Sequence, residues 1–135
     1  KNKNFEDKIL NINSKIKVFN SSYIPLNLEE FRNKRLYALA GIGNPENFFQ
    51  LLEANNLIIE KKIVFPDHYK ISKSEILAIL KDAERKNCQI IMTEKDYFKV
   101  KDYHINKIKY LKVSLNIEHN DRLIKIINSH YEKNF

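Results

Sequence analysis

Short apolar runs and stretches of helical periodicity follow one another along this chain. Residues 36–40 form an apolar run without polar alternation, which is typical of a strand covered on both faces of a parallel sheet. In the helical stretches, apolar residues recur three and four positions apart, so each predicted helix has one buried side. The pattern predicts strands over residues 15–19, 36–40, 57–65, 89–93 and 107–115, and helices over residues 46–54, 72–86, about 94–100 and from 120 onward.

Capping signals fix the ends of several of these helices. Asn44 fits an N-cap and Pro45 the first helical position, while Asn55 and Asn56 end the same helix. Ser72 and Glu75 have the spacing of a capping box. Further along, Thr93 and Asp96 are suited to cap a short helix through residue 100, and Asn120 the last helix. A helical turn is also expected within residues 28–34.

Strands that alternate with helices at this spacing predict βαβ units with right-handed crossovers. We therefore expect an α/β fold, Rossmann-like, with a mostly parallel sheet of about four to five strands flanked by helices. Residues 1–14, rich in Lys and Asn, are expected to form a flexible or weakly helical lead-in, and residues 15–135 a single α/β domain. The chain begins at Lys1, which suggests a piece of a longer protein.

Three loops of the predicted fold leave the carboxyl ends of strands. They are residues 41–45, 66–69 and 93–96. In an open parallel sheet these ends lie at one edge, which is where ligands bind. The three loops are therefore predicted to converge.

The first loop holds the only two glycines of the chain, Gly41 and Gly43. Each is expected where a Cβ would clash or where φ is positive. Together with Asn44 they are candidates to present backbone N–H groups and a helix N-terminus to an anion. A tight turn that serves packing alone is the equal alternative. No Lys-Ser/Thr pair follows the glycines, so the loop is not a P-loop.

The second loop carries the best candidate for catalysis. His68 follows Asp67, and a histidine beside a carboxylate can act as a general base for a hydroxyl group near neutral pH. A surface turn capped by Asp67 is the alternative, and position alone favours it.

The third loop is Thr93, Glu94, Lys95 and Asp96. Its cation between two carboxylates is suited to a phosphate contact or to a salt-bridge network that fixes the loops. Capping of the next helix is compatible with either role.

Composition limits the classes of function. The formal charge of +7 favours an acidic partner, such as a phosphate, a nucleic acid or an anionic membrane surface. Only four of the 24 cations are Arg, which is the preferred residue for phosphate recognition, so nucleic acid is disfavoured. Cys88 is the single cysteine, which excludes an internal disulfide, and no metal site is expected. No apolar run approaches the ~20 residues that span a bilayer, so the piece is expected to be soluble.

Three strings in this order resemble one known family. AGIGNPENFF at residues 40–49, FPDHY at 65–69 and IMTEKD at 91–96 are similar to the carboxyl-terminal half of tetraacyldisaccharide 4'-kinase, the lipid A 4'-kinase. The specific match covers residues 36–96, and residues 16–35 and the tail follow more loosely.

This resemblance implies a function for the whole enzyme. Such a kinase transfers the γ-phosphoryl group of ATP to the 4'-hydroxyl of an acylated glucosamine disaccharide phosphate, as a peripheral protein at the cytoplasmic face of the bacterial inner membrane. By resemblance, His68 works with an aspartate of the nucleotide-binding half to activate that hydroxyl. The P-loop and the residues for ATP and Mg²⁺ are implied to lie in the amino-terminal half, so residues 1–135 alone are expected to bind no cofactor and to have no kinase activity. The alternative from another class is a non-catalytic basic module that binds nucleic acid or anionic lipid.

Overall fold

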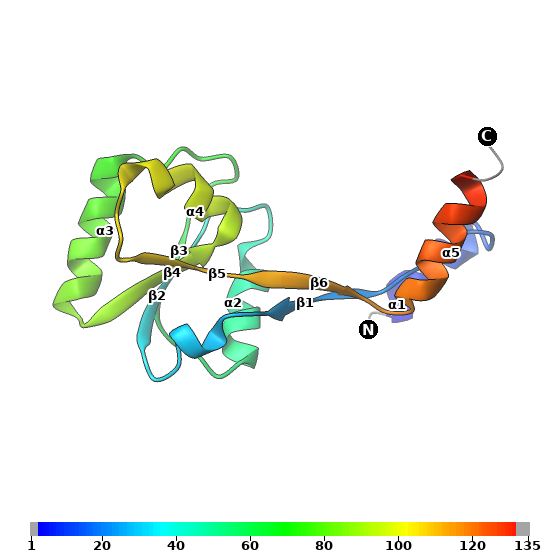
Figure 1. The fold of residues 1–135 in the computed structure, drawn as a ribbon, viewed down its shortest axis with the longest axis horizontal. Helices are drawn as coiled ribbons and strands as arrows, with labels where there is room; N and C mark the ends of the chain where they lie inside the picture. Colours follow the sequence, from blue (N-terminus) through cyan, green and yellow to red (C-terminus); the bar gives the residue numbers. More distant parts are fainter. Residues whose placement is uncertain (1–2, 132–135) are drawn as a thin grey trace. The chain divides into compact units, whose positions relative to one another are not determined.

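The computed structural model describes residues 3–131 and confirms the predicted alternation of strands and helices (Figure 1). The helices are α1 (Lys3–Ile12), α2 (Pro45–Ala54), α3 (Lys73–Arg85), α4 (Glu94–Val100) and α5 (Asn120–Tyr131), with 3-10 turns η1 (Leu28–Glu30) and η2 (Lys101–Tyr103). The strands are β1 (Ser21–Pro25), β2 (Arg35–Ala40), β3 (Ile58–Val64), β4 (Cys88–Thr93), β5 (Ile108–Leu111) and β6 (Val113–Ile117).

Contacts divide the chain into two compact units. The larger unit is the continuous segment Pro25–Val113. The smaller unit consists of the segment that ends at Ile24 and the segment that begins at Ser114, so it includes α1, α5 and most of β1 and β6. It stays a prediction that residues 15–135 fold as one domain after a lead-in over residues 1–14.

The larger unit contains a four-stranded parallel sheet in the order β3-β2-β4-β5. The central strand β2 pairs in parallel with both β3 and β4. Residues 36–40 of β2 are completely buried. The expected α/β fold with a parallel sheet flanked by helices is thus confirmed.

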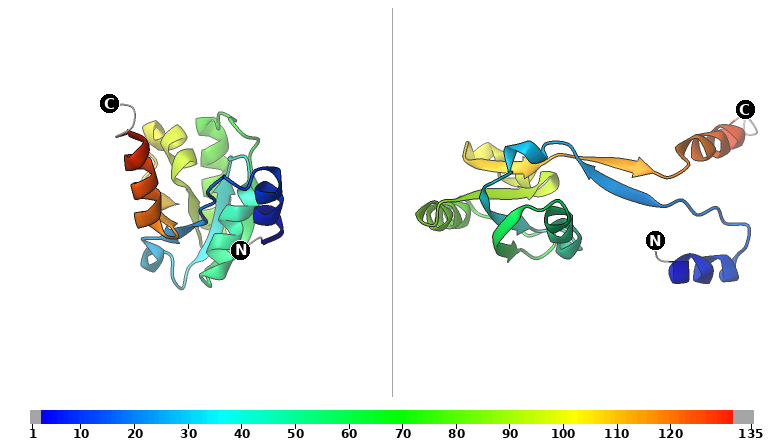
Figure 2. Two further views of the ribbon diagram at one scale, coloured as in Figure 1. Left: turned by 90° about the vertical axis from the view of Figure 1, so that its right-hand side faces the viewer. Right: turned by 90° about the horizontal axis from the view of Figure 1, so that it is seen from below.

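Alternate residues of β2 enter two different core clusters. Leu36, Ala38 and Ala40 pack with Phe49 and Leu52 of α2 on one face. On the other face, Tyr37 and Leu39 pack in a cluster that includes Ile76 and Ala83 of α3. Helices α2 and α3 can be followed in Figures 1 and 2. Because both faces of β2 are covered by a helix, its sequence has no polar alternation.

The strand predicted over residues 15–19 is wrong, because the first strand of the structure is β1, Ser21–Pro25. Alternating side chains suit a strand, but a strand also needs a partner for its backbone groups. That partner is β6, which pairs with β1 in a two-stranded sheet, and the pairing does not include residues 15–19.

The single strand predicted over residues 107–115 is also wrong, because it is two strands, β5 and β6, in different sheets. The chain changes sheets at Lys112. The side chain of Asn27 accepts a hydrogen bond from the Lys112 N–H at 2.8 Å and donates one to the Tyr110 carbonyl at 3.1 Å. An amide side chain far away in sequence thus takes the place of a strand partner at this junction.

Most of the predicted helix ends are confirmed. Ser72 and Glu75 form the capping box of α3, and Thr93 caps α4. Asn44 occupies the N-cap of α2, but its side chain makes no capping hydrogen bond. Asn120 is the first residue of α5 and not a residue before it.

Candidate functional site

The three predicted loops meet at the carboxyl edge of the parallel sheet. The Gly41 N–H donates a 2.8 Å hydrogen bond to Asp96 Oδ2, which joins the first loop to the third. A Cβ placed on Gly43 would lie 3.5 Å from Asp67 Oδ2, so the first loop also contacts the second. Lys95 Nζ lies 3.7 Å from Asp67 Oδ1 and links the second loop to the third. The predicted convergence of the loops is confirmed.

Asp96 is the only charged side chain that is fully buried among the described residues, with 1% of its surface exposed. In addition to the Gly41 N–H, its Oδ2 accepts a 2.7 Å hydrogen bond from the Thr93 hydroxyl. Its Oδ1 forms a 2.7 Å ion pair with Lys99 Nζ, which also donates to the Gly41 carbonyl at 3.1 Å. We call these four residues, Gly41, Thr93, Asp96 and Lys99, the Asp96 clasp. The clasp joins the first and third loops through Lys99, a cation that the sequence did not predict, whereas the predicted cation Lys95 lies beside Asp67.

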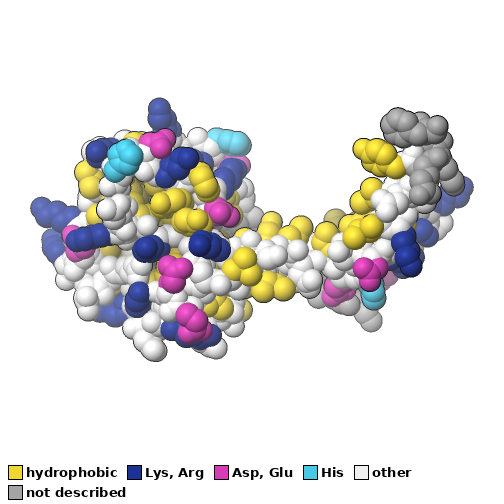
Figure 3. Space-filling model, viewed as in Figure 1, with side chains coloured by type: hydrophobic (Ala, Val, Ile, Leu, Met, Phe, Trp, Pro, Cys, Tyr) yellow, Lys and Arg dark blue, Asp and Glu magenta, His cyan; other side chains and the backbone are white. Residues whose placement is uncertain are grey.

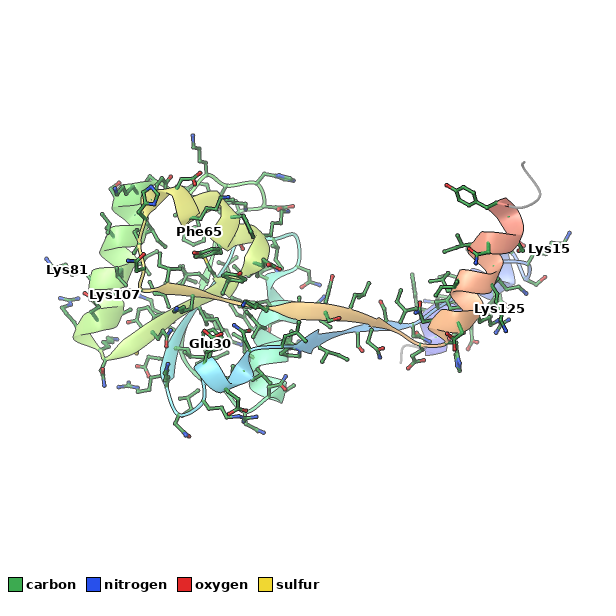
Figure 4. All side chains as sticks on the ribbon, viewed as in Figure 1. Lys15, Glu30, Phe65, Lys81, Lys107 and Lys125 are labelled. Atoms are coloured by element: carbon green, nitrogen blue, oxygen red, sulfur yellow. The ribbon has the colours of Figure 1, made fainter. Side chains whose placement is uncertain are left out.

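Gly41 of the first loop is explained by lack of space for a Cβ and not by backbone angle, whereas neither reason applies to Gly43. Neither has a positive φ, so that part of the expectation is wrong. A Cβ on Gly41 would come within 3.2 Å of both Asp96 Oδ1 and Phe65 Cβ, which is tighter than ordinary contact. Phe65 is labelled in Figure 4, and its N–H donates to the Ala40 carbonyl at 2.8 Å. Gly41 thus permits the close approach of the three loops, whereas Gly43 has room for a methyl group.

The loop that carries His68 is held by side chains on both sides of it. Tyr69 stacks on Phe65 with a centroid distance of 5.8 Å, and its hydroxyl donates to Glu75 Oε1 at 2.6 Å. That hydrogen bond comes first among the causes that raise the pKa of Tyr69. Glu75 also accepts the Ser72 N–H within the capping box, at 2.8 Å. The start of α3 therefore anchors the loop.

The imidazole of His68 lies at the surface of this edge, with 83% of the side chain exposed. The His68 N–H donates to Asp67 Oδ1 at 3.0 Å, and His68 Nε2 lies 3.7 Å from Asp67 Oδ2. The backbone of His68 is left-handed, with φ of 61°, which is uncommon for a residue other than glycine. The chain thus holds an open imidazole next to a carboxylate through a strained backbone conformation.

The neighbours of Asp67 lower the pKa of its carboxylate. Partial burial raises its pKa, but the hydrogen bond from the His68 N–H and the charges of His68 and Lys95 outweigh that effect, so the net pKa is lowered. Asp67 is therefore an acceptor at neutral pH, able to orient a donor beside it.

The predicted site residues separate into an exposed and a buried group. Gly43, Asn44, Asp67, His68, Glu94 and Lys95 are exposed along the edge. Gly41 and Asp96 are buried and Thr93 is half-buried, so these three lie beneath that surface. Lys99 was missed in the sequence, although its position three residues after Asp96 on a predicted helix is the spacing of an ion pair.

Three hollows of the larger unit, each about 380–460 Å³, lie away from the three loops. One is lined by residues of η1 and β5, including Glu30 and Tyr110, and the others lie near the amino ends of β2 and β4, beside Arg35 and Cys88. Within residues 3–131, no group of three or more His, Cys, Asp and Glu side chains could hold a metal ion.

Basic side chains of the larger unit are interspersed with acidic ones on the face drawn in Figure 3. Many form ion pairs, for example Arg35 with Glu60 at 2.7 Å and Lys107 with Glu84 at 2.6 Å. In the part of the chain that the structure describes, no helix is both long and apolar enough to cross a membrane.

Comparison with known proteins identifies a family. The family model described as tetraacyldisaccharide-1-P 4'-kinase matches residues 2–132. The tetraacyldisaccharide 4'-kinase of Pelagibacter ubique is 37% identical over 130 residues, which are 96% of this chain and 41% of that protein. The tetraacyldisaccharide 4'-kinase of Rickettsia africae is 36% identical over 120 residues, 87% of this chain and 37% of that protein. The chain thus spans about two fifths of the length of these relatives, in their carboxyl-terminal part.

A solved structure has the same fold. The crystal structure of LpxK from Aquifex aeolicus in complex with ATP matches with a TM-score of 0.54 and 16% identity. The match covers 89% of this chain and 40% of that one.

Proposed function

The chain belongs to the tetraacyldisaccharide-1-P 4'-kinase family, and we propose that it is the carboxyl-terminal part of an enzyme that phosphorylates the 4'-hydroxyl of a tetraacyldisaccharide 1-phosphate. The γ-phosphoryl group comes from ATP. The observation that carries the proposal is the convergence of three loops on one sheet edge, with the exposed imidazole of His68 beside the ionised Asp67.

His68 acts as the general base of the transfer. Its imidazole accepts the proton of the 4'-hydroxyl while the oxygen forms a bond to the γ-phosphorus and the bond from that phosphorus to the oxygen of ADP breaks. Phosphoryl transfer depends mainly on position and on electrostatic stabilisation, so the orientation of the acceptor is a large part of the task. With 83% of its side chain exposed, His68 is accessible to a sugar from outside this chain.

Asp67 orients the imidazole and stabilises the imidazolium that forms after proton transfer. The 3.7 Å from Asp67 Oδ2 to His68 Nε2 is longer than a hydrogen bond, and such contacts often tighten when substrate binds. Lys95, 3.7 Å from Asp67 Oδ1, contributes to the lowered pKa of that carboxylate and is a candidate cation for a contact with a substrate phosphate. The Asp96 clasp holds the loop of Gly43 and Asn44, whose backbone N–H groups are the remaining candidates for a phosphate contact.

Nucleotide binding belongs to another part of the enzyme. Among the described residues no group of three or more His, Cys, Asp and Glu side chains could hold a metal ion, and the loop of Gly41 and Gly43 is not a P-loop. We therefore assign ATP and Mg²⁺ to the amino-terminal half of a protein about as long as the relatives, and expect residues 1–135 alone to be inactive. The aspartate that works with His68 is assigned to the same half.

The cellular setting follows from the substrate. An acylated disaccharide phosphate is held in a membrane, so we place the enzyme at the cytoplasmic face of the inner membrane as a peripheral protein. The alternative of a nucleic-acid module is not favoured, because basic side chains alternate with acidic ones on the face in Figure 3 and do not form a continuous stripe there.

The test is a transfer assay with the full-length protein. ATP labelled in the γ-phosphate is mixed with a tetraacyldisaccharide 1-phosphate in detergent micelles, and label in the lipid is measured. We expect label with the full-length protein and none with residues 1–135. No transfer by a folded full-length protein that binds ATP would refute the proposed function, and transfer by residues 1–135 alone would refute the assignment of ATP to the other half.

A further inference from the structure

Residues 66–69 form a tight turn with His68 at its corner. The Tyr69 N–H donates a 3.0 Å hydrogen bond to the Pro66 carbonyl, which closes the turn. His68 is the third of the four residues and has φ of 61°, whereas φ of Asp67 is not positive. A positive φ at the third position is typical of a type II turn, where Gly or Asn is the usual residue. A histidine stays in such a conformation only when the surrounding structure enforces it.

The residue before this turn is fixed to the core of the sheet. Phe65, labelled in Figure 4, donates its N–H to the Ala40 carbonyl at 2.8 Å. Its side chain packs against the core cluster that contains Tyr37 and Leu39. A Cβ on Gly41 would lie 3.2 Å from Phe65 Cβ, so the first loop limits the movement of Phe65 as well. The turn therefore starts from a fixed point.

The residue after His68 is held by two contacts of its own side chain. The ring of Tyr69 stacks on the ring of Phe65, with centroids 5.8 Å apart and planes 6° apart. Because Phe65 precedes the turn and Tyr69 ends it, this stack holds the two ends of the turn together. The Tyr69 hydroxyl also donates to Glu75 Oε1 at 2.6 Å, which ties the end of the turn to α3.

Glu75 is itself a fixed acceptor. Its other carboxylate oxygen, Oε2, accepts the Ser72 N–H at 2.8 Å in the capping box of α3. Hydrogen bonds from Ser72 and then from Tyr69 lower the pKa of Glu75. The contact is therefore a hydroxyl group that donates to a carboxylate, which is stronger than a hydrogen bond between two neutral groups. The chain between Tyr69 and Ser72 is anchored too, because Ile71 is buried.

We propose that Tyr69 is a positioning residue for His68. Its stack on Phe65 and its hydrogen bond to Glu75 hold the turn in the conformation that places the imidazole at the carboxyl edge of the sheet. Because 83% of the His68 side chain is exposed, its position depends mainly on the backbone that carries it. A displacement of about 1 Å can lower a rate about 100-fold. This inference rests on the proposed function, since Tyr69 acts in the reaction only through His68.

Steady-state kinetics of the full-length protein test the proposal, with KM measured for ATP and for the lipid acceptor. Tyr69→Phe removes the hydrogen bond to Glu75 and keeps the ring, whereas Tyr69→Leu removes both contacts. We expect kcat to fall about 3- to 10-fold in Tyr69→Phe and about 10- to 100-fold in Tyr69→Leu, with both KM values within about twofold of the parent. Turnover like that of the parent in either variant would overturn the proposal. So would a raised KM for the acceptor with unchanged kcat, since it indicates that Tyr69 binds the substrate.

Tyr37→Phe is the matched control. The Tyr37 hydroxyl also donates to a carboxylate of α3, that of Asp82 at 3.0 Å, but Tyr37 lies in β2 and not in the turn. We expect Tyr37→Phe to leave kcat unchanged, although it removes the same kind of hydrogen bond. An equal fall of kcat in Tyr37→Phe and Tyr69→Phe would show that Tyr69 contributes only to stability, and would refute its positioning role.

NMR relaxation of the full-length protein gives a readout that does not need activity. The order parameter of the His68 amide, expected near about 0.85 in the parent, should fall below about 0.6 in Tyr69→Leu and stay unchanged in Tyr37→Phe. An equally rigid His68 in Tyr69→Leu would overturn the proposal. If the parent folds and binds ATP but transfers no phosphoryl group, the proposed function fails, and the order parameter still decides whether Tyr69 holds His68.

Discussion

Removal of the buried carboxylate of Asp96 should release all three partners of the Asp96 clasp. In Asp96→Ala, the Gly41 N–H and the Thr93 hydroxyl lose their acceptor, and the Lys99 ammonium loses its counter-ion. Breaking a buried ion pair from one side costs about 3–5 kcal/mol, because a buried charge is left unpaired. Lys99 has 24% of its side chain exposed and can be partly hydrated, so we expect a loss of about 3 kcal/mol in the free energy of unfolding.

Asp96→Asn removes the charge of the side chain and keeps its size and shape. The amide oxygen can still accept hydrogen bonds from Gly41 or Thr93, but the NH₂ group faces Lys99 Nζ. We therefore expect a loss of about 1–3 kcal/mol, the cost of an unsatisfied buried group. Glu94→Gln is the matched control, because Glu94 is an exposed acid in the first turn of the same helix, and its effect should stay within about 0.5 kcal/mol.

Urea unfolding of the 135-residue chain measures these differences, provided that the slope with urea stays constant among the variants. A double-mutant cycle with Lys99→Met should give a coupling of about 1 kcal/mol or more between Lys99 and Asp96. If Asp96→Ala unfolds with the same free energy as Glu94→Gln, or if the coupling is zero, Asp96 does not hold the loops together and the clasp has no role in positioning them.

Three further changes have expected outcomes in the same chain. Gly41→Ala should lower the free energy of unfolding by about 1–3 kcal/mol in urea, since its Cβ would meet Phe65 Cβ at 3.2 Å, whereas Gly43→Ala, with 3.5 Å to its nearest neighbour, should be nearly neutral. The pKa of Asp82 is lowered to about 2, and its hydrogen bond with Arg85 is the largest cause. Because this folded pKa is below the unfolded value, the ionised carboxylate stabilises the folded protein above about pH 4, and this contribution is lost as the pH falls through 2. Asp82→Asn should therefore lower the melting temperature at pH 7, and the difference from the parent should shrink as the pH falls from about 4 to below 2. A constant difference across that range would contradict this. Asn87, with φ of 53°, should lose about 1 kcal/mol as Ala and little or nothing as Gly, and equal stability of the two variants in urea would contradict the left-handed conformation.

The parallel sheet was predictable because its signals are local. The apolar run of β2 indicates that both faces of this strand are covered. The capping box of Ser72 and Glu75, which spans four residues, marks the start of α3. The meeting of the three loops followed from topology, since strands that run in parallel end at the same edge.

The errors occurred where a distant partner decides the local structure. The break between β5 and β6 depends on the side chain of Asn27, more than eighty residues earlier in the chain. The position of β1 depends on its pairing with β6 in the same way. Alternating side chains in KIKVF or KIKYLKVSL contain no information about which backbone will pair with them.

The sequence predicted where the exposed residues of the candidate site lie, but it did not predict the buried contacts of Asp96 beneath them. His68 and Asp67 were found from their place after a strand, and their catalytic roles stay predictions. The burial of Asp96 was not foreseen, because a carboxylate between Lys95 and Lys99 in sequence resembles an exposed charge cluster. Left-handed positions were expected at glycines, yet they are filled by Asn and His, for example Asn56 and His68.

We propose that this sheet edge supplies the base that activates the sugar hydroxyl. The most direct test compares kcat of the full-length enzyme with that of His68→Asn, because Asn tolerates the left-handed backbone at φ of 61°. His104→Asn is the control, an exposed histidine of the same unit with φ of 54°. We predict that His68→Asn lowers kcat by ~100-fold or more and that His104→Asn leaves it unchanged. A folded His68→Asn enzyme that turns over as fast as the parent would contradict the account.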